Sequence, residues 1–179
     1  MGLFQPSPHP NEASTQRDAF GRLRVSDART LFDSKLLVSD YPTLFWDDQQ
    51  TSGAGTSTTY AQVDARIRLA VSNATAGTRV RQTFRRFNYQ PGKSQMAFMT
   101  FNMNGGVAGV TKRVGLFDAN NGLFFQMNGT TPEFVVRKAG FDRRFPQSVW
   151  NQDQLNGSGY SQINFDPTKA QILYFDFEW

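Results

Sequence analysis

The 179-residue sequence contains no cysteine and a single histidine, His9. The absence of cysteine excludes a disulfide framework, a thiolate nucleophile and a thiolate metal site. One histidine excludes a histidine-based metal cluster, and a Ser-His-Asp triad would have to use His9. That residue lies among prolines near the N-terminus, where we expect a solvated side chain. The sequence therefore predicts no enzyme activity, no metal and no cofactor.

Long apolar runs and a strong charge of one sign are also missing. The longest apolar runs are far too short to cross a bilayer, and the start, MGLFQPSPHPNEA, lacks the basic and apolar regions of a signal peptide. The net charge is only +4, and the 14 arginines and 5 lysines are dispersed along the chain. Arginine suits planar contacts at protein interfaces. We therefore expect protein partners, no nucleic acid and no membrane.

The first 33 residues differ from the rest of the chain. Prolines at positions 6, 8 and 10 block helix and favour extended backbone. Isolated apolar residues then alternate with charges, so this segment cannot bury a core of its own. It is either a floppy terminus or an arm that becomes ordered by docking onto a partner. We predict an extended N-terminal arm over 1–33, with assembly contacts at Phe20, Arg22, Leu23 and Arg24.

From residue 34 onward the pattern is that of β-structure. Residues 62–69 alternate apolar and polar side chains, which is typical of a half-buried strand. Residues 80–89 predict a second strand whose phase slips at Arg85-Arg86, where a β-bulge would restore one buried face. Residues 96–103 are apolar on both parities and predict a central strand covered on both faces.

The second half of the chain carries the clearest turn signals. Over 112–138, the pairs Asn121-Gly122 and Asn128-Gly129 separate three strands of a meander. Residues 139–168 predict a long packed loop. Residues 171–179 predict a strand in which large apolar residues alternate up to the last position. Because chain ends usually become polar, we expect the polypeptide to continue beyond Trp179. No amphipathic helix is recognisable, and the sequence predicts an all-β antiparallel β-sandwich over 34–179.

Few groups of residues carry chemistry. Asp47-Asp48 is the best carboxylate pair and is interpreted as a solvated strand end. Asp176 and Glu178 share a strand face about 7 Å apart, which glycoside hydrolysis tolerates, but any strand with acidic residues at i and i+2 does the same. The arginines at 79, 81, 85 and 86 form either a solvated strand face or an anionic docking face. Trp150 and Tyr160 in the long loop either fill the end of the sandwich or stack on sugar rings.

Three stretches resemble a known group of proteins. DAFGRLRVSDARTLFDSK (18–35) resembles the start of structural proteins from tailed-bacteriophage virions, and RQTFRRFNYQPGKSQ (81–95) and YFDFEW (174–179) are similar to later parts of that group. The resemblance implies a virion component, such as a fibre, tail-associated or capsid-decorating protein. It also implies a jelly-roll or concanavalin-like β-domain whose last strand is followed by more sheet. No catalytic residues carry over from it.

These observations together predict a non-enzymatic structural protein of a tailed-phage virion, assembled in the host bacterial cytoplasm. The arm would anchor it to the particle or to sister subunits, and the β-sandwich would project or decorate. We expect other virion proteins and the chain itself as partners, in a homotrimer or another homo-oligomer. The alternative is a glycan-binding jelly-roll module for host attachment, with Trp150 and Tyr160 as glycan contacts.

Overall fold

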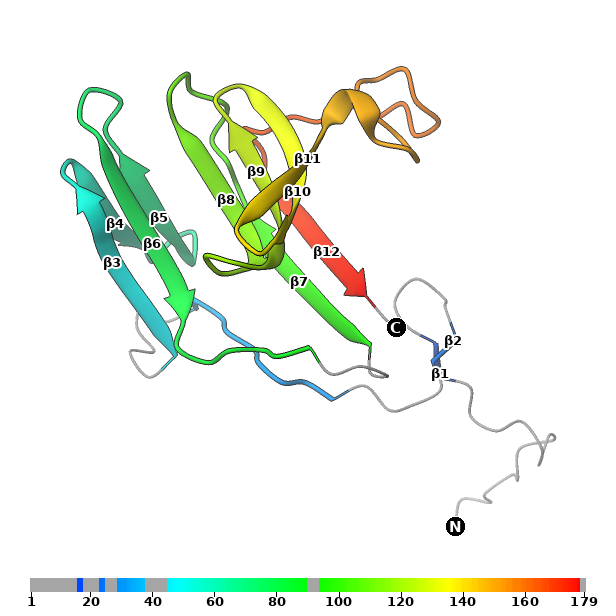
Figure 1. Ribbon diagram of the computed structural model, residues 1–179, viewed down its shortest axis with the longest axis horizontal. Helices are drawn as coiled ribbons and strands as arrows, with labels where there is room; N and C mark the ends of the chain where they lie inside the picture. Colours follow the sequence, from blue (N-terminus) through cyan, green and yellow to red (C-terminus); the bar gives the residue numbers. More distant parts are fainter. Residues whose placement is uncertain (1–15, 18–22, 25–28, 38–44, 90–93, 178–179) are drawn as a thin grey trace, which may run out of the picture.

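The computed structural model describes residues 29–37, 45–89 and 94–177, together with the backbone of 16–17 and 23–24. The described chain is all-β, every strand pairing is antiparallel, and the one helical element is a single 3-10 turn, η1 (Gln147–Val149) (Figure 1). This confirms the predicted all-β antiparallel class. The strands are β1 (Gln16–Arg17), β2 (Leu23–Arg24), β3 (Trp46–Gly53), β4 (Thr56–Ala61), β5 (Arg66–Val71), β6 (Gly77–Thr83), β7 (Gln95–Phe101), β8 (Thr111–Phe117), β9 (Gly122–Asn128), β10 (Thr131–Lys138), β11 (Phe141–Pro146) and β12 (Gln171–Phe177).

The largest sheet has the order β11-β10-β9-β8 and contains the predicted meander. The Asp118 carboxylate accepts hydrogen bonds from the backbone N–H groups of Asn120 and Asn121, both at 2.7 Å, and so holds the turn before β9. Gly129 adopts a φ of +63° in the turn between β9 and β10, a conformation that glycine accepts without steric cost. The three strands expected over 112–138 are therefore confirmed. β11 adds a fourth strand within the stretch that was predicted to be a loop.

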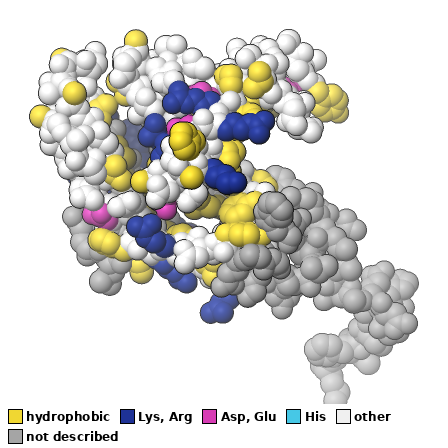
Figure 2. All heavy atoms as spheres, viewed as in Figure 1, with side chains coloured by type: hydrophobic (Ala, Val, Ile, Leu, Met, Phe, Trp, Pro, Cys, Tyr) yellow, Lys and Arg dark blue, Asp and Glu magenta, His cyan; other side chains and the backbone are white. Residues whose placement is uncertain are grey.

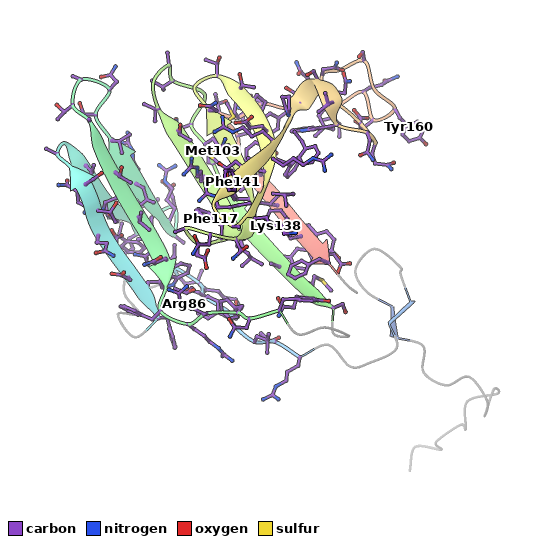
Figure 3. The ribbon with its side chains drawn as sticks, viewed as in Figure 1. Arg86, Met103, Phe117, Lys138, Phe141 and Tyr160 are labelled. Carbon is purple, nitrogen blue, oxygen red and sulfur yellow. The ribbon has the colours of Figure 1, made fainter. Side chains whose placement is uncertain are left out.

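A second layer, the β7–β12 ribbon, packs against this sheet. Its register runs from Gln171 opposite Phe101 to Phe177 opposite Gln95, so alternate residues point to one face. Leu173 on that face forms a buried cluster with Phe125 and Met127 of β9 and with Met103. Met103 is labelled in Figure 3. Partly buried apolar residues surround this cluster: Met99, Phe101, Val114, Phe134, Trp150, Phe165 and Phe175.

Two further ribbons, β3–β6 and β4–β5, are nested one inside the other along the sequence, and we call them the nested ribbons. In Figure 1 they are drawn to the left of the four-stranded sheet. The chain passes from β3 to β4 through Gly53, which has a φ of +66° and whose Cβ, if present, would lie 1.9 Å from the Ala76 carbonyl oxygen. Glycine is thus required where the two reversals of the chain meet.

Residues 29–37 lie against the nested ribbons. The Phe32 ring makes edge contacts with Phe45, Trp46 and Phe87 at centroid distances of 6.1, 5.7 and 5.6 Å. The Trp46 indole N–H donates to Ser34 Oγ at 2.9 Å, and the Tyr60 hydroxyl donates to the backbone carbonyl of Leu36 at 2.8 Å. This docked segment spans both sides of the predicted boundary between arm and domain.

Two sequence predictions in this region are wrong. Residues 62–65 are the turn between β4 and β5, with the Val63 side chain fully exposed and Ala65 at a φ of 47°, so only part of 62–69 is strand. The strand expected over 80–89 ends earlier, since β6 ends at Thr83. The phase slip at 85–86 is therefore no β-bulge within the strand but the point where the chain leaves the ribbon. The register shift of this ladder lies on β3, between residues 50 and 52. A turn of alternating residues has the same pattern as a strand, which explains the first error.

The expectation that 96–103 forms a central strand covered on both faces is also wrong. β7 has one partner among the described strands, β12, and the ladder ends at Phe101. On the face away from the core, Met96 and Phe98 are 37% and 53% exposed. The apolar residues of the second parity therefore lie at the surface of a two-stranded ribbon.

Candidate functional site

A partly open cavity of about 630 Å³ lies between the four-stranded sheet, the β7–β12 ribbon and the loop after η1. Its size and largely apolar lining are those of small-ligand sites in proteins. The polar residues at its rim are Asn151, Gln152, Asp153 and Gln171. Six of the fourteen lining residues are aromatic: Phe101, Phe125, Phe134, Phe145, Trp150 and Phe165.

Trp150 is held firmly in this wall. Its indole N–H donates to the backbone carbonyl of Phe145 at 2.9 Å, and its ring packs on Phe134 at a centroid distance of 5.1 Å. Because the polar end of the indole is satisfied inside the protein, only the ring remains for a ligand, through stacking or apolar contact.

The loop beyond Trp150 is organised by Asp153. Its carboxylate accepts hydrogen bonds from the backbone N–H groups of Ser161 and Leu155, both at 2.7 Å. The bond from Ser161, followed by that from Leu155, lowers the pKa of Asp153 below its ordinary value. Asp153 therefore stays ionised and fixes the loop.

The structure does not bring the two predicted glycan contacts together. Trp150 lines the cavity, whereas Tyr160 is not part of its wall. Tyr160 is fully exposed and projects from the loop away from the sheets (Figure 3). The cavity lining offers amides instead: the side chains of Asn151 and Gln152 line it and make no hydrogen bond with another described residue. Any ligand held here would meet aromatic rings and neutral amides.

The predicted arginine cluster is divided between two environments. Arg79 and Arg81 point into the nested ribbons and reach Asp48 at 2.5 and 3.3 Å, and their side chains are only 20% and 12% exposed. Thr58 joins them, since its hydroxyl donates to Asp48 at 2.7 Å and accepts from Arg79 Nε at 2.6 Å. The expectations of a solvated strand face, of an anionic docking face and of a solvated end at Asp48 are therefore wrong for these residues.

Arg85 and Arg86 point outward. Arg85 Nη1 donates to the Leu31 carbonyl at 2.7 Å, and Arg86 lies 3.7 Å from the Asp118 carboxylate with its side chain 78% exposed. On the face shown in Figure 2, basic side chains of the described residues are scattered among acidic and neutral ones rather than gathered in one patch. This arrangement gives the visible face no concentrated positive field.

The candidate carboxylates form no catalytic pair in the part of the chain that the structure describes. Asp47 accepts hydrogen bonds from the side chains of Gln49 and Gln82 at 2.9 and 3.1 Å. Asp176 accepts from the Tyr174 hydroxyl at 2.8 Å, and its proposed partner Glu178 lies outside the described residues. Within the described ranges, no three acidic or histidine side chains gather as a metal site would require.

Sequence reasoning missed a polar network on the outer face of the four-stranded sheet. Gln126 is fully buried and Glu133 is 5% exposed. Arg113 Nε donates to Gln126 Oε1 at 2.9 Å, the Gln126 amide donates to Glu133, and Arg144 lies 3.9 Å from the same carboxylate. The only signal in the sequence was that these polar residues occupy positions on the same face of three neighbouring strands. That relation becomes visible only once the strand register is known.

The same face is completed by a bidentate ion pair. Arg137 donates to both Asp142 oxygens, at 2.6 and 3.1 Å, and this hydrogen bonding lowers the pKa of Asp142. The guanidinium groups of Arg113 and Arg137 lie over the fully buried Phe124 ring, 5.6 and 5.1 Å from its centroid. A covering of stacked guanidinium groups thus closes this face of the sheet.

The predicted arm contacts lie largely outside what the structure describes. Phe20, Arg22 and His9 are outside the described residues, and for Leu23 and Arg24 only the backbone is described, as β2. β2 pairs with β1 in an antiparallel two-residue ladder.

Comparisons with known proteins identify no relative. No family model matches the chain, and no curated protein or solved structure matches it either. Within the described residues, no helix has the length and apolar character needed to span a membrane.

Proposed function

We propose that this chain is a non-enzymatic structural component of a tailed-phage virion. It is a homo-oligomer that is anchored to the particle or to sister subunits by its arm over 1–33 and that projects or decorates with its β-domain. The resemblance over 18–35, 81–95 and 174–179 supports the virion assignment. The jelly-roll or concanavalin-like form of the sandwich belongs to the same proposal, which is supported by the packing of the four-stranded sheet on the β7–β12 ribbon.

The observation that carries the proposal is the distribution of apolar side chains. The seven buried apolar residues all lie between Met103 and Leu173, so none belongs to 29–37 or 45–89. Large apolar side chains on strands are instead partly exposed, including Leu69, Met96 and Phe98. Packing against other chains would bury these exposed apolar side chains. This distribution supports a role in assembly.

The test of this function is incorporation into particles. A chain lacking residues 1–30 and a full-length Tyr160→Ala variant would each be produced in infected cells in place of the native protein. We expect the truncated chain to be absent from purified virions and Tyr160→Ala to be incorporated normally. Equal incorporation of both would contradict anchoring by the arm.

A second candidate function is glycan binding for host attachment, favoured by the aromatic cavity with its rim of amides. Sugars are held in proteins by apolar contacts of their rings together with hydrogen bonds to polar side chains, and Trp150, Asn151 and Gln152 offer both. Binding on a glycan array that is lost in Trp150→Ala and retained in Tyr160→Ala would support the cavity as the site. A chain that binds nothing across the array would count against it.

A further inference from the structure

We propose that β5 pairs edge to edge with β5 of a second copy of this chain, in an antiparallel register that places Leu69 opposite Leu69. The inference rests on the proposed function only in expecting self-association. It goes further because it names the strand, the register and the partner.

Within the described residues, the β4–β5 ribbon has no further strand hydrogen-bonded at either edge. It is a two-stranded sheet, and isolated two-stranded ribbons are marginally stable in water. The ribbon meets the other nested ribbon through polar groups, since Thr58 is hydrogen-bonded to Asp48 and Arg79. The apolar side chains of the same ribbon face, Leu69 and Val71, remain 44% and 38% exposed. A further strand beside β5 would extend this two-stranded sheet and support it.

Among the described strands, the free edge of β5 presents unpaired backbone groups. Ser72 N–H donates to the Gly55 carbonyl at 2.9 Å, and the ladder continues with Thr56 opposite Val71. Hydrogen-bonded and non-hydrogen-bonded pairs alternate along an antiparallel ladder. The N–H and C=O groups of Ile67, Leu69 and Val71 therefore point away from β4, toward an edge that no other described strand pairs with.

The edge of β5 has few features that would prevent another strand from pairing with it. The sequence of β5, RIRLAV, contains neither proline nor glycine, and its ladder with β4 has no register shift. Straight edges with β-branched and other apolar residues are templates for pairing with another chain. The two arginines of β5 lie on the ribbon face opposite Leu69, so they do not block the approach of a strand in the plane of the sheet.

The register follows from charge. With Leu69 opposite Leu69, Ile67 meets Val71 of the second copy, and Arg68 meets Ala70, so no two arginines face each other. A shift of two residues in one direction would place Arg68 opposite Arg68, which is destabilising. A shift in the other direction would place Ile67 opposite residue 73, beyond the end of the strand. The proposed register joins the apolar rows of Ile67, Leu69 and Val71 within the strand without opposing like charges.

Disulfide trapping in the full-length chain tests this pairing, because the native sequence has no cysteine and each introduced thiol is unique. Opposite residues in an antiparallel pair are about 4.5–5.5 Å apart at Cα, within disulfide range. The same residue in the two copies, at 68 or at 70, lies on a diagonal of about 7–8 Å. After mild oxidation, we expect a mixture of Arg68→Cys and Ala70→Cys to give about tenfold more cross-linked dimer than either variant alone.

The control is Val63→Cys, which is fully exposed on the turn of the same hairpin and has no opposite residue in the proposed pair. A mixture of Arg68→Cys and Ala70→Cys that cross-links no more than Val63→Cys would overturn the pairing.

A second measurement covers the case in which the cysteine variants fold poorly. In Leu69→Arg, the new charge would face itself across the two-fold axis, so native mass spectrometry should show half the number of copies, whereas Val63→Arg should leave the mass unchanged. An odd number of copies in the native chain, or an unchanged mass in Leu69→Arg, would overturn the pairing and leave the proposed function standing. Normal incorporation of the chain lacking residues 1–30, together with efficient cross-linking, would contradict anchoring by the arm and leave the β5 pairing standing.

Discussion

Replacing Asp48 with alanine should destabilise the nested ribbons strongly. Asp48 is the carboxylate that faces both Arg79 and Arg81, and the two arginine side chains are 20% and 12% exposed. Removing one partner of a buried ion pair costs about 3–5 kcal/mol because the remaining charge is left unpaired. Since Arg79 retains some contact with water, we expect the lower end of that range, about 3 kcal/mol.

Urea unfolding followed by far-UV circular dichroism measures this change in the free energy of unfolding. The matched control is Asp64→Ala, which breaks an ion pair with Arg66 of 2.9 Å in the same ribbons, but between side chains that are 50% and 60% exposed. Exposed pairs contribute about 0–1 kcal/mol, so this variant should unfold almost like the native chain. A loss in Asp48→Ala no larger than that in Asp64→Ala would refute the structural role of the buried cluster.

Three further outcomes are expected. Gly122→Ala would place a Cβ 2.3 Å from Cβ of Phe117 at a φ of +151°, so its thermal unfolding midpoint should fall by several degrees, as scanning calorimetry would show. Phe32→Ala should cost about 2 kcal/mol in urea unfolding and raise amide exchange over 31–37, and unchanged exchange would contradict docking of this segment. Hydrogen bonds lower the pKa of Asp142 and of Asp153 in the folded state, so their stabilisation is present above about pH 4 and is lost as pH falls through the lowered values. The stability difference between the native chain and Asp153→Asn should accordingly be larger at pH 7 than at pH 2.5, and an equal difference at both would contradict this role of the carboxylate.

The parts of the fold that sequence reasoning predicted are those fixed by local chemistry. The strands over 112–138 are separated by Asn-Gly pairs whose tolerance of positive φ selects tight turns, so three strands and their antiparallel order follow from the residues alone. The terminal strand, β12, was predicted by strict alternation of large apolar residues. In both cases the determining interactions lie within a few residues of each other.

What could not be predicted depends on contacts distant in sequence. The strand β6 pairs with β3 across more than twenty residues, and this pairing turns Arg79 and Arg81 inward to Asp48. The cavity wall combines residues from three layers, so Trp150 could be named from sequence as a candidate, while its separation from Tyr160 could not. Polar pairs across strands, such as Gln126 beside Glu133, become recognisable only when the register of neighbouring strands is known.

The central claim, that this chain functions by assembling with copies of itself, is tested most directly by the mass of the purified full-length protein in solution. Native mass spectrometry at physiological salt should give a multiple of the 20.2 kDa chain mass. An even number of copies agrees with both the proposed function and the β5 pairing, and a trimer agrees with the function alone. A species of 20.2 kDa at micromolar concentration would contradict the account.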